Sequence, residues 1–181
     1  DFKHLFQEFN NKKVLIVGDA MIDAYMWGKI NRMSPEAPVP VVEVKKHENR
    51  LGGAANVALN LKALGATPIL CSVVGTGNRG VLFEELMEES NLSTEGILST
   101  SKRKTTIKTR VIAENKHQLR IDEEETYPIV QAEEFLTLTK SLMHDVDVII
   151  LQDYNKGVLT PEVIESVIAA ANKRGIPTIV D

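Results

Sequence analysis

LGGAANVALNLKALGATPILCSVVG, residues 51–75, is the stretch of this chain that says most about its fold. Residues 53–64 have the apolar spacing of a helix, and residues 67–74 form an apolar run typical of a buried strand. Gly52 and Gly53 stand at the expected helix start, although glycine is a poor helix former. Two explanations are open: the chain makes a tight turn, or a ligand approaches the backbone closely where side chains are small. The apolar stripe of this helix is expected at Val57, Leu61 and Leu64.

Strands and helices alternate on both sides of this stretch. Short apolar runs predict strands at residues 12–18, 67–74, 146–151 and 176–180. Helical spacing predicts helices at residues 53–64, 80–90, 131–144 and 160–174. This alternation is typical of an α/β fold whose doubly wound, mostly parallel sheet has helices on both faces.

Two segments do not fit the alternation, at about residues 24–48 and 103–123. The first contains prolines at positions 35, 38 and 40 followed by alternating valines, which excludes a helix and suits an edge strand. The second reads as a hairpin with strands at residues 105–113 and 117–122. We therefore expect a small open β-sheet that projects from the main body.

The composition is that of an ordinary globular protein. The chain has 181 residues, of which 43% are hydrophobic and 25% charged, and this suits one domain. A net charge of −4 gives no electrostatic reason to expect nucleic acid or an anionic membrane as a partner. No apolar run approaches the roughly 18 residues of a membrane span and no signal peptide opens the chain, so we expect a cytoplasmic protein. The single Cys71 is expected to be a buried, inert thiol.

Polar or glycine-containing turns follow four of the predicted strands, at residues 18–23, 75–77 and 153–156 and at Asp181. Ligands of doubly wound sheets bind at the carboxyl ends of the strands, so these turns predict a polar small-molecule site at one rim. For any single aspartate the alternative is a helix N-cap. Carboxylates together with Asn56 would suit sugar hydroxyls.

The strand at residues 176–180 is expected to be central or near-central in the sheet. No loop or helix follows it in this sequence. We therefore expect a C-terminally truncated chain, in which residues 1–181 form the N-terminal part of one domain.

Other catalytic motifs are weak or absent. GTGNRG, residues 75–80, matches the dinucleotide fingerprint G-x-G-x-x-G, so an NAD-dependent dehydrogenase stays a distant alternative. Against it, this is not the first strand–helix unit of the chain, and the strand-like piece at residues 95–98 is weak. The sequence contains no G-x-x-x-x-G-K-[ST] and no G-x-S-x-G, and its four histidines are too scattered to predict a zinc site.

Residues 52–75 resemble the first signature of the ribokinase-like, or phosphofructokinase-B, carbohydrate kinases. Its small residues, asparagine and later glycines fall at Gly52, Gly53, Asn56, Ala58, Gly65 and Gly75. GDAMIDAY (residues 18–25), RMSPEAPVPVVEV (32–44) and QDYNKG (152–157) are similar to the D-glycero-β-D-manno-heptose 7-phosphate kinases. These occur alone or as the first domain of a bifunctional ADP-heptose biosynthesis protein, and the resemblance covers about residues 13–181.

The resemblance implies a ribokinase-like sugar kinase that uses ATP and Mg²⁺ to phosphorylate the C1 hydroxyl of heptose 7-phosphate, a precursor step for the lipopolysaccharide inner core. The small sheet would be a lid that clasps its copy in a homodimer. Together with the rim turns, the resemblance gives the candidate substrate-binding residues Asp19, Asp23, Gly52, Gly53, Asn56, Arg120, Asp153 and Lys156. Lys156 would meet the substrate's own phosphate, and Arg120 would reach it when the lid closes. The plain alternative for both is an exposed cation.

The chain departs from the family pattern in two places. Gly77 stands in GTGNRG where many relatives carry an aspartate, which leaves the role of that loop open. The second signature of the family, D-T-x-G-A-G-D, is absent, and it supplies the catalytic aspartate and the helix start that steadies the transferred phosphoryl group. We therefore expect residues 1–181 to lack the catalytic base and to be inactive alone. A non-catalytic sugar-phosphate-binding or dimerisation module remains the alternative function.

Overall fold

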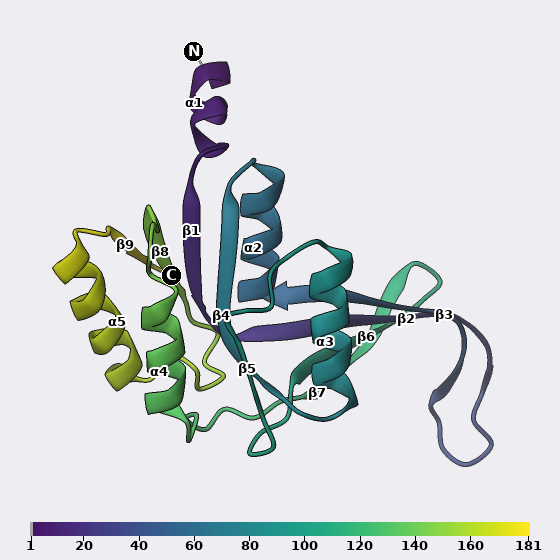
Figure 1. Cartoon of the computed structure of the whole chain (residues 1–181). Coiled ribbons are helices and arrows are strands. Elements are labelled where there is room, and N and C mark those ends of the chain that lie inside the picture. The colour runs from purple at the N-terminus through teal and green to yellow at the C-terminus, as the bar shows by residue number, and fades with distance from the viewer. Residues whose placement is uncertain (1) are drawn as a thin grey trace.

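Strand β1 (Lys13–Gly18) lies at the centre of the main sheet, as its run of apolar β-branched residues predicts. The structure is a computed structural model that describes residues 2–181. The main sheet has the order β5-β4-β1-β8-β9, and all its neighbouring strands are parallel (Figure 1). Its other strands are β4 (Thr67–Gly75), β5 (Ile97–Thr100), β8 (Val148–Gln152) and β9 (Thr178–Val180).

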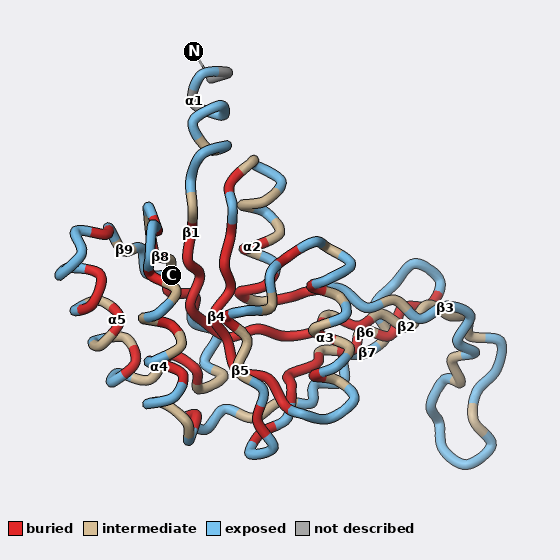
Figure 2. The backbone as a smooth tube through the Cα atoms, viewed as in Figure 1, coloured by how far each residue is buried: buried red, intermediate tan, exposed pale blue. Residues whose placement is uncertain are grey.

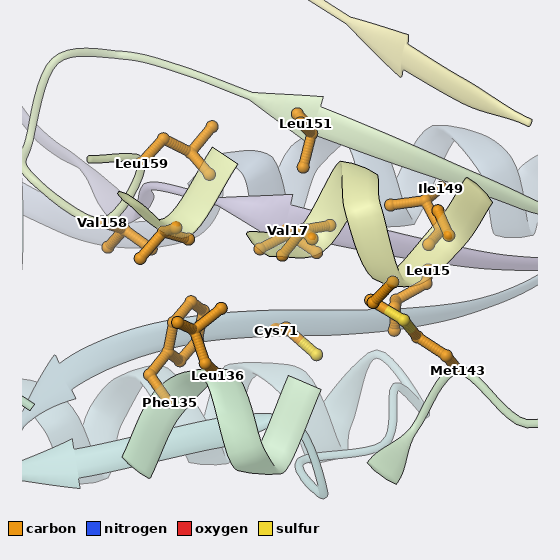
Figure 3. Close-up of a cluster of buried hydrophobic side chains, with 14 of the residues drawn as sticks. Leu15, Val17, Cys71, Phe135, Leu136, Met143, Ile149, Leu151, Val158 and Leu159 are labelled. Atoms are coloured by element: carbon orange, nitrogen blue, oxygen red, sulfur yellow. The ribbon is translucent and has the colours of Figure 1, made fainter. Parts of the chain in front are cut away.

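Alternate residues of β1 face two separate cores, because successive side chains of a strand point to opposite sides. Leu15 and Val17 pack with Phe135 under helices α4 (Ala132–Ser141) and α5 (Pro161–Arg174) (Figure 3). Ile16 faces the other side, under α2 (Ala54–Ala63) and α3 (Asn78–Glu89). Helices thus cover both faces of the sheet, which confirms the predicted doubly wound fold. Helix α1 (Phe2–Phe9) precedes β1 and extends away from the sheet in Figure 1.

A second, small sheet projects from the main body (Figure 1). It has the order β3-β2-β6-β7, with β2 (Ala20–Met33), β3 (Pro40–Gly53), β6 (Thr106–Ala113) and β7 (Lys116–Glu123). The β2–β3 and β6–β7 pairs are antiparallel, and β2 and β6 are parallel. The inner ends of β2 and β3 are buried and their outer ends are exposed (Figure 2). This sheet contains both segments that did not fit the strand–helix alternation.

Single elements differ in detail from the sequence predictions. The strand before Asp181 was expected to be central or near-central in a complete sheet, and among the described residues β9 is the outermost strand, beside β8. The weak stretch near residues 95–98 forms the edge strand β5, which is held by pairing with β4. Residues 20–33 were not predicted as a strand in full, because alternation along β2 is interrupted by polar residues on its exposed half.

The buried face of α2 also differs from the prediction. Ala54, Ala55 and Ala58 are buried, whereas Leu64 is 40% exposed. Small side chains let the helix backbone lie close against the strands, so alanines form the contact and the larger residues of the expected stripe lie at its margin.

Candidate functional site

Asp19 lies in the connection between β1 and β2, at the rim predicted from the sequence, and is buried. Its Oδ2 accepts hydrogen bonds from the backbone N–H groups of Tyr154 and Lys156, each at 3.0 Å, and its Oδ1 accepts one from Val158 at 3.0 Å. Burial raises the pKa of Asp19, and these three N–H groups partly offset that rise. The carboxylate therefore holds the loop after β8 in place, and its acceptor sites are directed at the protein itself.

The loop after β8 carries two more of the predicted residues, Asp153 and Lys156. Asp153 is exposed, and its Oδ1 accepts a hydrogen bond from the backbone N–H of Asn155 at 2.6 Å. Lys156 is half-buried, and its Nζ lies 3.5 Å from Oε2 of Glu124. Arg103, which is buried, stabilises the loop by donating a hydrogen bond to the backbone oxygen of Lys156. Asp153 thus bonds within its own loop, whereas Lys156 reaches the segment that follows β7 of the small sheet.

Gly52 and Gly53 end strand β3, and α2 begins at the next residue. A Cβ on Gly53 would lie 2.4 Å from the backbone oxygen of Asp19, and Gly53 has φ 57°. A Cβ on Gly52 would lie 2.6 Å from Oδ2 of Asp23. These glycines therefore allow the chain's own backbone and the Asp23 carboxylate to come close. Whether a sugar also approaches them stays a prediction.

Asp23 lies on β2 in the face of the small sheet that does not pack against α2. Cross-strand partners share a face, so Asp23 stands beside Lys108, and Tyr25 stands beside Arg110. On β7, Asp122 is the partner of Lys108, and Arg120 is the partner of Arg110. We call these six residues the charged face of the small sheet: Asp23, Tyr25, Lys108, Arg110, Arg120 and Asp122.

Ion pairs connect the residues of the charged face. Nη1 of Arg110 lies 2.5 Å from Oδ1 of Asp23, and its guanidinium lies 5.4 Å from the centre of the Tyr25 ring. Arg120 is exposed and binds Asp122 with two hydrogen bonds of 2.8 and 2.9 Å. The face thus offers acceptors and cations side by side, as recognition of hydroxyl and anionic groups requires.

Asn56 is placed apart from Asp23. It is exposed and lines a hollow of about 380 Å³ together with Asn49, Leu51 and Leu86. Leu51 pairs with Ile22, whose side chain is in the core under α2, so this hollow is on the opposite side of the small sheet from the charged face. Asn56 therefore lies close to Gly52 and Gly53 along the chain but not on the charged face with Asp23.

The GTGNRG loop forms the start of α3, with Gly77 at the N-cap. It borders a hollow of about 410 Å³ whose lining includes Arg79, Arg103 and Glu123. Nη1 of Arg103 is buried and has no hydrogen-bond partner within residues 2–181. The loop therefore lies at the carboxyl end of β4, beside the candidate site.

The sequence analysis missed four residues that the structure places at the site: Tyr25, Lys108, Arg110 and Glu124. Tyr25 follows Asp23 by two positions, and Arg110 follows Lys108 by two. This spacing of two along a strand is the signal that could have placed them on one face with Asp23. Glu124 follows β7 and has no such signal.

Two classes of site are not found in the part of the chain that the structure describes. Residues 2–181 contain no group of three or more His, Cys, Asp or Glu side chains that could hold a metal ion. None of the described helices is both long and apolar enough to span a membrane.

Residues 11–181 match the family model described as pfkB family carbohydrate kinase. Two curated relatives, both named "Bifunctional protein HldE", are similar to this chain over most of its length. The protein of Citrifermentans bemidjiense is 42% identical over 183 residues, which cover 100% of this chain and 38% of the relative. That of Helicobacter pylori strain G27 is 47% identical over 164 residues, which cover 90% of this chain and 35% of the relative. The chain thus spans little more than a third of these relatives.

Solved structures share the fold at low sequence identity. A carbohydrate kinase from Agrobacterium tumefaciens superposes with a TM-score of 0.68 at 18% identity, covering 93% of this chain and 53% of that one. A ribokinase of Arabidopsis thaliana, solved in complex with ribose and ATP, gives 0.66 at 18% identity, covering 94% and 53%. At this identity the likeness shows the ribokinase-like fold and no more.

Proposed function

Because the chain belongs to the pfkB family of carbohydrate kinases, we propose that it binds the sugar acceptor of a kinase reaction and orients it for phosphorylation. The single observation that carries this proposal is the arrangement of Asp23 and Lys156. Asp23 neighbours Lys108 on the charged face, and Lys108 and Lys156 contact the same carboxylate, Glu124. A carboxylate and a cation held this close suit a polyhydroxyl compound that carries an anionic end.

The substrate we propose is D-glycero-β-D-manno-heptose 7-phosphate, with its C1 hydroxyl as the acceptor. The motifs at residues 18–25, 32–44 and 152–157 support this choice over a neutral sugar. Sequence identity of 42–47% to two proteins that share one name supports it as well. The product would enter the ADP-heptose route to the lipopolysaccharide inner core. A non-catalytic binding module is the weaker alternative, because the family of this chain is one of kinases.

In the proposed reaction this chain positions the acceptor. Asp23 is held by Arg110 through Oδ1, so its other oxygen can accept hydrogen bonds from sugar hydroxyls beside Gly52. Lys156 would hold the 7-phosphate, and the loop that carries it is fixed by Asp19. Fixing both ends of the sugar lowers the entropy that must be lost to reach the reactive geometry.

We propose ATP with Mg²⁺ as the phosphoryl donor, and ATP supplies the phosphoryl group when it is bound. The support for ATP is the family and the Arabidopsis ribokinase that was solved with it. Within residues 2–181 no acidic cluster fits a metal ion, so we assign Mg²⁺ to no residue of this chain. We assign the catalytic base to none of its residues either, because the sequence contains no D-T-x-G-A-G-D segment.

We also propose that the small sheet is a lid over the sugar and the contact surface of a homodimer. Its outer strands β3 and β7 have free edges within the described residues, and exposed strand edges tend to pair with other chains unless they are covered. Apolar side chains are exposed there, namely Met33, Val39, Val44, Leu119 and Ile121. A second copy would cover them.

A kinase assay on the intact protein tests the proposed function. ATP consumption should depend on heptose 7-phosphate, and phosphorus NMR should show a new anomeric phosphate on the product. The unphosphorylated heptose serves as the matched control and should react poorly. Turnover with both sugars alike, or with neither, would contradict the proposed substrate.

A further inference from the structure

Two lysines from different parts of the fold meet at one carboxylate. Lys108 belongs to β6 of the small sheet, whereas Lys156 belongs to the loop that follows β8 of the main sheet. Their Nζ atoms lie 2.7 and 3.5 Å from the same oxygen, Oε2 of Glu124. The side chains of the two lysines are only 16% and 13% exposed. Two ammonium groups held this far out of water need anionic ligands, and here they share one oxygen atom.

The hydrogen bonds of Lys108 confirm that it is held as a cation. Burial alone would lower the pKa of Lys108, but its hydrogen bonds to Glu124 and Asp122 raise it overall. The pKa of Glu124 is lowered, chiefly by the hydrogen bond from Lys108. Each partner therefore stabilises the charged form of the other.

Glu124 is more easily displaced from Lys108 than Asp122 is. Asp122 lies within β7, and Arg120 binds both of its oxygens. Glu124 lies in the irregular segment just after β7, and its hydrogen-bond partners among the described residues are the two lysines. Rotation of the Glu124 side chain would free the ammonium group of Lys156 and one hydrogen-bond position of Lys108, whose other bond, to Asp122 at 2.9 Å, would stay in place.

The position of the lysine pair matches the far end of a bound sugar. Lys108 is the cross-strand neighbour of Asp23, whose carboxylate we propose as the acceptor for sugar hydroxyls. Neighbouring strands lie about 4.8 Å apart, which is shorter than a sugar ring with its exocyclic carbons. A sugar on Asp23 is therefore long enough to reach the lysine pair.

We propose that Lys108 and Lys156 form a two-lysine clamp for the terminal phosphate of the sugar substrate, and that Glu124 occupies this clamp until the substrate displaces it. The inference rests on the proposed function and gives Lys108 a binding role. A phosphate dianion offers each ammonium group its own oxygen and two negative charges, whereas Glu124 offers one shared oxygen and a single charge. The internal carboxylate thus makes the clamp selective, because a neutral sugar gains nothing by displacing it.

Calorimetry on the intact protein with two ligands, heptose 7-phosphate and unphosphorylated heptose, tests the clamp. Lys108→Met should weaken binding of the phosphorylated sugar about 10- to 100-fold, the range for a lost charge-assisted hydrogen bond. It should leave the affinity for the unphosphorylated sugar within about twofold. Lys108→Arg should restore part of the loss, and Glu124→Gln should strengthen binding of the phosphorylated sugar, because the competing charge is gone. Lys116→Met, at the exposed first residue of β7 in the same hairpin, is the matched control and should bind both ligands as the wild type does.

A titration with inorganic phosphate, followed by phosphorus NMR, separates this inference from the proposed function. Wild-type protein should broaden the phosphate signal and the Lys108→Met variant should not, whatever sugar the protein accepts. If wild type binds neither sugar yet binds phosphate through Lys108, the proposed substrate is wrong and the clamp stands. Equal loss of both sugars in Lys108→Met, or weaker phosphate binding in Glu124→Gln, would overturn the clamp.

Discussion

Asp19 shows how one residue can hold together the segments of a proposed site. Its two carboxylate oxygens accept three backbone hydrogen bonds from the loop that carries Lys156, and its own backbone oxygen accepts from Ala54 at the start of α2. The sequence resemblance predicts that Asp19 lies close to the sugar, and the structure gives the residue a structural role. The residue joins the three segments from which the proposed site is built.

Asp19→Asn should therefore destabilise the protein although it preserves size and shape. An amide has only one acceptor oxygen, so its NH₂ group would face an N–H donor of the loop and leave that donor unsatisfied. We expect a loss of about 1–3 kcal/mol in the free energy of unfolding, measured by urea denaturation. Asp153→Asn is the matched control, because its single acceptor bond to Asn155 survives, and it should change stability by less than about 0.5 kcal/mol. Equal effects of the two changes would show that the Asp19 hydrogen bonds do not stabilise the fold.

Asp23→Asn addresses the sugar contact itself. The variant keeps an oxygen for Arg110 but loses the negative charge that favours bonds from hydroxyl groups. Sugar affinity should fall by about 1–3 kcal/mol, and it should fall alike for phosphorylated and unphosphorylated heptose, because Asp23 does not face the phosphate. Calorimetry gives both values. Asp145→Asn, an exposed position in the turn before β8, should bind as the wild type does. Unchanged affinity in Asp23→Asn would remove Asp23 from the site.

At the scale of elements, the starts of α2 and α3 form a natural pair. Each helix follows an N-cap glycine without a side-chain cap, Gly53 and Gly77. The two glycines differ in their surroundings. Gly53 has φ 57° and its Cβ position lies 2.4 Å from a backbone oxygen, whereas no atom lies within 4 Å of the Cβ position of Gly77.

Gly53→Ala should accordingly cost at least about 2 kcal/mol, from the left-handed backbone and from the clash with Asp19. Gly77→Ala should change stability by about 0.5 kcal/mol or less. Thermal unfolding of both variants under the same conditions measures the difference. If Gly53→Ala is as stable as Gly77→Ala, the β3–α2 junction is looser than the structure shows.

The exposed edge of β3 gives a prediction about assembly. Val42→Lys with Val44→Lys should convert the proposed dimer to a monomer, because two charges would be buried against the second copy. Light scattering on the intact protein reports the mass. Val130→Lys is the control, since Val130 is 69% exposed but precedes α4 on the main body, and it should remain dimeric. A double variant that stays dimeric would place the contact elsewhere.

For the whole molecule, the expectation from sequence was that residues 1–181 do not phosphorylate sugars alone. Residues 1–181 contain the surface that we propose for the sugar, but the sequence has no segment resembling the second family signature. Loss of a general base alone lowers rates by about 10²–10⁴-fold. A coupled assay of ATP consumption should therefore show turnover of residues 1–181 reduced at least that far below the intact protein. Turnover within tenfold of it would mean that the catalytic residues lie in this part of the chain.

The sequence predicted the main sheet well, because buried strands and amphipathic helices follow local patterns such as that of residues 12–18. It predicted the small sheet only in part, since the long strand β2 is stabilised by its neighbours rather than by its own composition. Lys108 and Glu124 could not have been paired from sequence. Their contact depends on the cross-strand register of β6 and β7 and on a loop from another sheet.

The position of β1 has a consequence for synthesis on the ribosome. This strand is made early, whereas its neighbour β8 is made late. The backbone N–H groups that bind the Asp19 carboxylate lie 135 or more residues further along the chain. At elongation rates of about 5–20 residues per second, these groups emerge roughly 7–28 s after Asp19. Throughout that interval one edge of a very apolar strand stays open, and the loop that carries Lys156 does not yet exist. A nascent chain of this protein therefore exposes an edge of β1 to aggregation until β8 is made.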